Sequence, residues 1–248
     1  MSELATRRGG SSYGRGLHGD VVTSLGRQIV SGALQPGAVL NMERLEEEFS
    51  VSRSVLREAV RVLSAKGLVE ARPKRGTIVC PSSRWNLLDP YVMVWKVNTG
   101  IPDEQYLQSW EQVRWIIEPQ AVRMAATHRT EEDLVGMRLI LNELADSMAR
   151  DDIECYIAAD LSFHHALLVA TCNQLLVQLG AITEEALGQR DSLVYRGRFG
   201  EAFDFDHHHA VYSAIRDGDE DAAEQAMRAL LAQSSALLGV TLASEKAL

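Results

Sequence analysis

Residues 50–76, SVSRSVLREAVRVLSAKGLVEARPKRG, decide the fold of the first part of this chain. Apolar side chains recur every three or four residues, which predicts an amphipathic helix that begins after Ser52 and ends near Lys66. Ser52 stands where its hydroxyl can cap this helix by accepting a hydrogen bond from a first-turn amide. The opposite face of the predicted helix carries three arginines, which are Arg53, Arg57 and Arg61.

The pattern changes after Gly67 from a helical repeat to the alternation typical of strands. Residues 68–72 and 77–79 alternate in this way, and the turn between them contains Lys74 and Arg75, which predicts a wing with a basic tip. Two apolar helices precede this region, one around residues 25–30 and one over residues 42–49. This order is that of a winged helix-turn-helix, in which one helix enters the major groove of DNA. The alternative is an ordinary amphipathic helix with a solvated arginine face.

Residues 29–79, IVSGALQPGAVLNMERLEEEFSVSRSVLREAVRVLSAKGLVEARPKRGTIV, resemble the GntR family of bacterial transcription factors. The resemblance implies that the recognition helix contacts bases and phosphates and that the wing enters the minor groove. The residues that it assigns to the helix are Ser52, Arg53, Ser54 and Arg57, and those that it assigns to the wing are Arg75 and Gly76.

Length and charge agree with two domains. The chain has 248 residues and a net charge of −9, but residues 1–84 hold 13 Lys and Arg against 8 Asp and Glu, a net of +5, which leaves −14 for the rest. The basic part can attract phosphate while the acidic part stays away from it. We expect a flexible tail over residues 1–16, a DNA-binding domain over 17–82, a linker over 83–102 and an effector-binding helical domain over 103–248.

No apolar run approaches the roughly 18 residues that span a bilayer, and no signal peptide is evident, so we expect a cytoplasmic protein without a membrane partner. Cys80, Cys155 and Cys172 are odd in number and lack metal-ligand spacing, which favours reduced thiols.

From residue 103 onward the sequence predicts consecutive helices over 103–128, 131–150, 152–171, 174–197, 205–217 and 219–242. Thr130 and Asn173 can cap two of them, and Asp217-Gly218-Asp219 ends one helix and begins another. The fold class is therefore mainly α, with an N-terminal winged helix-turn-helix followed by an all-α bundle of six or seven helices.

Five of the seven histidines form two clusters, at 164–165 and 207–209. Asp160 precedes His164 by four residues, so both side chains occupy one helix face at a spacing that suits two ligands of one metal. A third ligand from a separate helix would complete the set, whereas a solvated Asp-His pair and an exposed polar run are the alternative.

Residues 110–231 resemble the FCD domain of the FadR-type subgroup, through EQVRWIIEPQAVRMAA at 111–126, DLSFHHALLVATCNQLL at 160–176 and HAVYSAIRDGDEDAAEQAMRALL at 209–231. The resemblance implies a divalent metal, such as zinc, manganese or nickel, bound by Asp160, His164 and His208. Leu230 stands where the family pattern has a fourth histidine. A metal-free site, in which the same residues bind the ligand by hydrogen bonds, is the alternative.

Arg114 lies in a largely apolar segment, where an unpaired guanidinium would be costly to bury. Its fork geometry suits bidentate binding of a carboxylate, and the alternative is a buried pair with Glu118 one turn away. We also expect Asn173 and Arg190 to contact the effector. The stretch RWNLLDPYVMVW at 84–95, together with Leu230, resembles galactonate-responsive regulators and implies an aldonic acid.

The sequence therefore predicts a homodimeric transcriptional repressor that binds a palindromic double-stranded operator and is released by a sugar acid or related hydroxy acid. A metal-dependent enzyme that uses the Asp-His-His set, and an architectural DNA-binding protein, are the other classes considered. We expect a non-enzyme, because no general base, nucleophile elbow or phosphate loop is evident.

Overall fold

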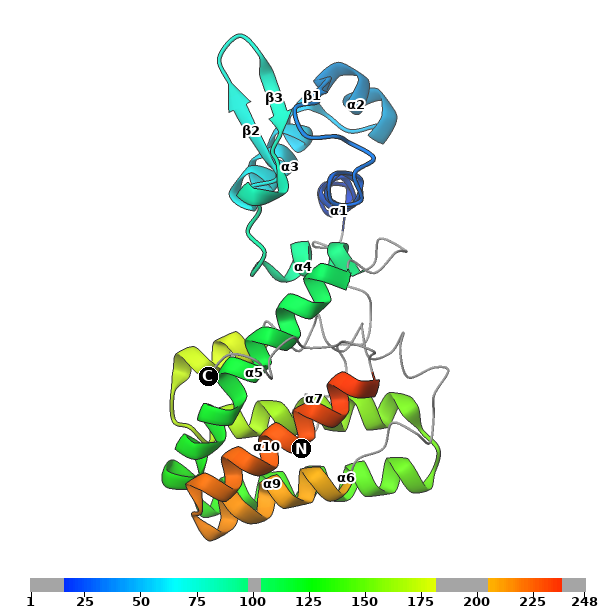
Figure 1. The fold of residues 1–248 in the computed structure, drawn as a ribbon. Helices are drawn as coiled ribbons and strands as arrows, with labels where there is room; N and C mark the ends of the chain where they lie inside the picture. Colours follow the sequence, from blue (N-terminus) through cyan, green and yellow to red (C-terminus); the bar gives the residue numbers. More distant parts are fainter. Residues whose placement is uncertain (1–15, 98–103, 182–204, 238–248) are drawn as a thin grey trace. The chain divides into compact units, whose positions relative to one another are not determined.

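The computed structural model describes residues 16–97, 104–181 and 205–237 (Figure 1). The chain divides into two compact units, residues 1–102 and 103–248. Most of the expected N-terminal tail lies outside the described residues.

The first unit is a winged helix-turn-helix, as predicted. Strands β2 and β3 form an antiparallel hairpin in which Val69 pairs with Val79 and Arg72 with Gly76, and the short strand β1, which we did not predict, pairs with the other side of β3. The elements are α1 (Leu17–Val30), β1 (Val39–Leu40), α2 (Met42–Phe49), α3 (Arg53–Ala65), β2 (Val69–Arg72) and β3 (Gly76–Val79) (Figure 1).

Local signals fix where the helices of the first unit begin and end. Ser52 Oγ accepts a hydrogen bond from the Val55 amide, which confirms the predicted cap of α3. Asn41 caps α2 in the same way, and Ser50 adopts a left-handed conformation where α2 ends. The apolar faces of α1 and α3 then meet in one core, in which Leu25 and Leu56 are fully buried.

Residues 83–102, which we expected to be a linker, contain ordered structure that belongs to the first unit. A short 3-10 turn, η1 (Ser82–Arg84), is followed by α4 (Pro90–Val97), and Trp95 of α4 joins the core. Its ring lies so close to Gly26 of α1 that a Cβ atom at position 26 would overlap it. Part of this segment therefore packs as an integral element of the first unit.

Helices are the only regular secondary structure among the described residues of the second unit, as predicted. Helix α6 packs on α7, and α10 packs on both α5 and α9. The elements are α5 (Glu104–His128), α6 (Glu131–Ala149), α7 (Ile153–Val169), α9 (Phe205–Asp217) and α10 (Glu220–Leu237), and residues 174–181 are also helical (Figure 1).

The predicted breaks between these helices are confirmed. Thr130 and Asp133 form a reciprocal capping box at the start of α6. Asn173 Oδ1 accepts the amide of Leu175 at the start of the next helix, and Gly218 turns the chain between α9 and α10 with a φ of 75°. None of the described helices is long and apolar enough to cross a bilayer.

Candidate functional site

The exposed end of α3 carries the predicted DNA contacts. Ser52, Arg53, Ser54 and Arg57 are all exposed. Arg53 Nε lies 3.8 Å from a carboxylate oxygen of Glu46, whereas Arg57 has no ion-pair partner among the residues that the structure describes. The first two turns of α3 therefore present cationic groups to solvent, the arrangement required for contact with bases or phosphates.

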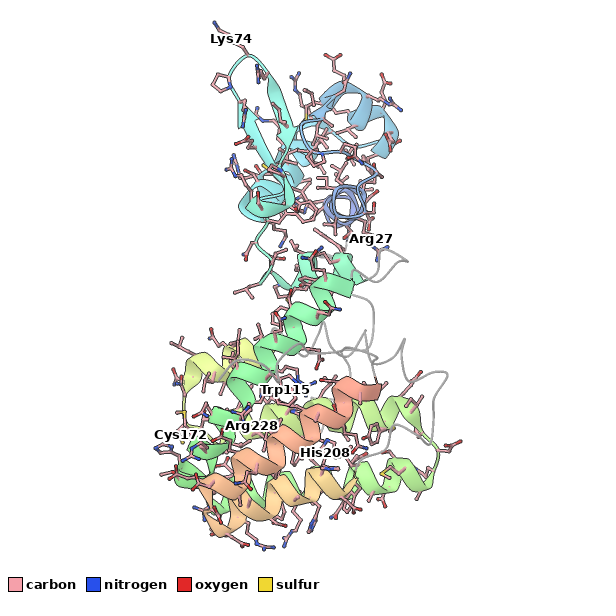
Figure 2. The ribbon with its side chains drawn as sticks, viewed as in Figure 1. Arg27, Lys74, Trp115, Cys172, His208 and Arg228 are labelled. Atoms are coloured by element: carbon pink, nitrogen blue, oxygen red, sulfur yellow. The ribbon has the colours of Figure 1, made fainter. Side chains whose placement is uncertain are left out.

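Ion pairing differs between the strands of the wing and its turn. Glu70 of β2 pairs with Arg72 on the same strand and with Arg84. Lys74, labelled in Figure 2, and Arg75 lie in the turn between β2 and β3, and neither forms an ion pair within the described part of the chain. The tip is therefore the end of the hairpin that remains electrostatically available to DNA.

The structure brings together the three predicted metal ligands in the second unit. Asp160 and His164 lie on α7, and His208, labelled in Figure 2, lies on α9. His208 Nε2 is 2.8 Å from Asp160 Oδ1, and His164 Nε2 is 3.9 Å from Asp160 Oδ2. One potential ligand atom from each residue lies within 4.8 Å of the other two. We call these three residues the Asp-His-His cluster.

Arg114 of α5 joins this cluster to Glu118. Its Nε donates to Glu118 Oε1 at 2.7 Å, so the buried pair considered from the sequence is present. Its Nη2 is 2.9 Å from His164 Nε2 and 3.4 Å from Nδ1 of the same ring. A donor that hydrogen-bonded to the Nε2 lone pair would lie in the plane of the ring, on the side of Nε2 that faces away from Nδ1. Such an atom would be much farther from Nδ1 than the 3.4 Å observed. The guanidinium therefore lies over the ring face and leaves that lone pair to another partner.

Burial and opposite charges act against each other at these groups. Burial raises the pKa of Asp160, but hydrogen bonding to His208 and the charge of Arg114 outweigh it and hold that pKa well below its usual range. For Glu118, burial is likewise outweighed by Arg114 and His164, which lower its pKa to about 2. Burial lowers the pKa of Arg114, but its acidic neighbours raise it overall. These groups therefore keep their charges at neutral pH.

A second buried carboxylate, which the sequence reasoning did not identify, lies on the other side of Arg114. Glu111 is fully buried, with Oε1 3.9 Å from Arg114 Nη1 and Oε2 3.3 Å from the Ser235 hydroxyl that donates to it. Trp115 Nε1 donates to the same hydroxyl at 3.3 Å. The positions of Glu111 and Glu118, three residues before and four after Arg114, are the signal that could have revealed this face of α5.

Charge provides a test of whether a divalent cation fits this cluster. Glu111, Glu118 and Asp160 contribute three negative charges and Arg114 one positive charge, so the sum is −2 when both imidazoles are neutral. Such an excess is costly in a buried site unless a cation balances it. One carboxylate oxygen and two imidazole nitrogens are also suitable ligands for zinc and related metals. The residues therefore fit a divalent metal.

The remaining predicted residues have separate positions. Leu230 is buried in the apolar core of the second unit, consistent with a side chain that cannot bind a metal. Asn173 uses its side-chain oxygen as the cap described above, and its proposed contact with an effector stays a prediction. Arg190 lies outside the described residues.

Comparison with known proteins gives matches over both units. Residues 17–79 match the gntR family of bacterial regulatory proteins, and residues 111–233 match the FCD domain. The chain is 36% identical over 219 residues to the galactonate operon transcriptional repressor of Escherichia coli (strain K12), which covers 87% of this chain and 93% of the relative. It is 33% identical to the uncharacterized HTH-type transcriptional regulator YieP of the same organism, over 84% of this chain and 89% of the relative.

A solved structure supports the fold independently. Lar, which controls expression of the agr system of Listeria monocytogenes, superposes with a TM-score of 0.62 over 90% of this chain and 97% of its own, at 20% sequence identity.

Proposed function

Because this chain belongs to the GntR family of bacterial regulatory proteins and is a DNA-binding transcription regulator with an FCD domain, we propose that it represses sugar-acid catabolic genes. The effector in this proposal is an aldonic acid such as galactonate, which is supported by the similarity to a repressor of the galactonate operon of Escherichia coli. Binding of this acid releases a homodimer from a palindromic operator.

The observation that carries the proposal is the position of Arg114 over His164, beside the Asp-His-His cluster. A guanidinium binds carboxylate in two parallel hydrogen bonds, and a metal accepts carboxylate and hydroxyl oxygens as ligands. The two groups lie close enough to act on the acid end of one molecule. A 2-hydroxy acid presents both kinds of oxygen at that end.

Electrostatics explain why the metal supports effector binding. When both imidazoles are neutral, the cluster together with Glu111, Glu118 and Arg114 carries a charge of −2 and would repel an entering carboxylate, whereas a divalent ion would remove that excess. Asp160, His164 and His208 would hold the ion, and when bound it would supply a Lewis acid for the effector oxygens. Leu230 provides no further ligand, so more of the coordination sphere is left to water and effector.

Release requires that the effector binds the conformation with low operator affinity more tightly than the other one. A coupling free energy of roughly 1 to 3 kcal/mol would change operator affinity by about 5- to 150-fold. The exposed arginines of α3 and the basic wing tip are the groups that we assign to operator binding.

Thermal-shift measurements on the full-length protein test this function. Aldonic acids should raise the unfolding temperature more strongly with zinc, manganese or nickel than after chelation, because a ligand stabilises the state that binds it. A panel in which no hydroxy acid shifts the transition, with or without metal, would refute the proposed effector class.

A further inference from the structure

His164 lies between two carboxylates, one near each nitrogen of its ring. Its Nδ1 is 2.8 Å from Glu118 Oε2 on α5, and its Nε2 is 3.9 Å from Asp160 Oδ2, one turn earlier on α7. Only 12% of the His164 side chain is exposed. The ring is therefore largely removed from water, and its protein neighbours decide which of its nitrogens carries the proton.

Glu118 offers the closer acceptor for that proton. A neutral imidazole has one N–H to donate, and an ionised carboxylate can only accept. Asp160 already has His208 Nε2 at 2.8 Å from its Oδ1, and Arg114 lies over the His164 ring face, where it leaves the Nε2 lone pair unused. The proton of His164 therefore belongs on Nδ1, and the lone pair of Nε2 faces the cluster.

The two oxygens of Glu118 have different partners. Oε1 accepts from Arg114 Nε at 2.7 Å, which fixes the carboxylate in place. Oε2 is buried and has no aligned hydrogen bond among the residues that the structure describes, because the Nδ1 contact is close but not well directed. Buried acceptors normally receive a hydrogen bond. A small rotation of the imidazole would bring Nδ1–H into line with Oε2 and satisfy both groups.

The position of the proton matters for metal binding, because an imidazole nitrogen that carries a proton has no lone pair to offer. Histidines that bind a metal almost always donate their other N–H to a carboxylate, a carbonyl or water, which fixes the ring and raises its basicity. With the proton on Nε2 instead, His164 would point an N–H at Asp160, and the Asp-His-His cluster would lack one ligand.

We propose that Glu118 is a positioning residue for this cluster, which accepts the Nδ1–H of His164 and so presents the Nε2 lone pair to a divalent ion. Through its other oxygen the same carboxylate holds Arg114, so one side chain orients both a metal ligand and the guanidinium that we assign to the effector. The assignment rests on the proposed function, which places a divalent ion at the cluster. The alternative is that Glu118 serves only to pair with Arg114.

Nitrogen NMR of zinc-loaded, full-length wild-type protein tests the assignment without any substitution. Long-range ¹H–¹⁵N spectra show which nitrogen of a histidine ring is protonated and which binds the ion, once the His164 ring has been assigned through its backbone. We expect Nδ1 of His164 to carry the proton and Nε2 to bind zinc. A role confined to pairing with Arg114 would not fix this choice.

Glu118→Asp tests the same point through affinity. It keeps the negative charge but withdraws the carboxylate by one methylene group, out of reach of Nδ1, so a loss of affinity cannot come from a change of net charge. Competition with a chromophoric chelator should show zinc bound about 10- to 100-fold more weakly. Glu111→Asp is the matched control, because it shortens another buried carboxylate near the same guanidinium and should bind zinc as wild type does.

Several results would overturn the role of Glu118 and leave the proposed function standing. They are zinc bound through Nδ1 of His164 in the wild type, wild-type zinc affinity in Glu118→Asp, and equal losses in Glu118→Asp and Glu111→Asp. If Glu118→Asp fails to fold, the wild-type spectrum decides alone. Wild-type protein that takes up no zinc, manganese or nickel would instead refute the metal site of the proposed function, and this inference with it.

Discussion

Lys66 Nζ and Asp89 Oδ2 form an ion pair at 2.6 Å, with only 7% and 17% of the two side chains exposed. Lys66 follows the last residue of α3, and its ammonium also lies 4.7 Å from the centre of the Tyr91 ring. The other oxygen of Asp89 accepts the amides of Tyr91 and Val92 at the start of α4. One carboxylate therefore caps α4 and binds the end of the recognition helix.

Replacement of Asp89 should destabilise the first unit. Asp89→Asn can keep the helix cap but leaves the Lys66 ammonium buried without its anion, so we expect a loss of about 3 kcal/mol. Hydrogen exchange of the α1 and α3 amides in the full chain measures this loss. The exposed Arg84–Glu70 pair supplies the control, since Arg84→Met should cost less than about 1 kcal/mol. Equal effects of the two variants would contradict the structural importance of the buried pair.

Gly26 and Gly136 provide opposite tests of packing. Gly26→Ala would drive a methyl group into the Trp95 ring, and we expect the free energy of unfolding to fall by about 1 to 3 kcal/mol. Gly136→Ala in α6 places its methyl group where nothing lies within 4 Å apart from its chain neighbours and the nearby backbone of its own helix, so it should stabilise the helix by about 0.5 to 1 kcal/mol. Urea unfolding of each variant measures the change in stability, and hydrogen exchange in α1 or α6 assigns that change to the affected helix. A more stable Gly26→Ala protein or a less stable Gly136→Ala protein would contradict the packing described for these positions.

Arg57 should matter more for operator binding than Arg61. Arg57 is exposed and has no described ion-pair partner, whereas Arg61 Nη1 donates to Glu58 at 2.7 Å. We expect Arg57→Ala to weaken operator binding by about 1 to 3 kcal/mol. Mobility-shift titrations at matched salt compare Arg57→Ala with Arg61→Ala, which should lose less operator affinity. Arg228→Ala in α10 is the control for the loss of a distant charge. The assignment fails if Arg57→Ala binds the operator with wild-type affinity.

The metal site leads to a prediction about stoichiometry. Purified protein should take up about one divalent ion per chain, and His164→Ala should abolish this uptake because one of three ligands is lost. His209→Ala should retain the ion, since His209 is exposed and outside the Asp-His-His cluster. Leu230→His should tighten metal binding by adding an imidazole as a fourth ligand. Elemental analysis that finds no ion in wild type would remove the metal from the account.

The sequence was sufficient where a feature depends on neighbouring residues. The cap at Ser52, the capping box at Thr130 and the turn at Gly218 are local signals, and the structure confirms all three. The spacing of Asp160 and His164 is local as well. Their meeting with His208, 44 residues after His164, followed from the resemblance and not from the spacing.

Features that depend on distant contacts were missed. Trp95 looked like part of a linker because nothing nearby in the sequence shows that Gly26 leaves room for its ring. Glu111 was not singled out from the sequence, because its hydrogen-bond partner Ser235 lies 124 residues later. Tertiary packing, rather than helical periodicity, decides both cases.

Operator release in Arg114→Lys tests the central claim most directly. Lysine keeps the positive charge that the buried carboxylates require, but it lacks the planar fork that binds a carboxylate through two hydrogen bonds. With zinc-loaded protein and a fluorescent operator, anisotropy should show wild-type affinity for DNA and a concentration of galactonate for half-release that rises by at least about 10-fold. Release at the wild-type concentration of galactonate would contradict the assignment of Arg114 to the effector.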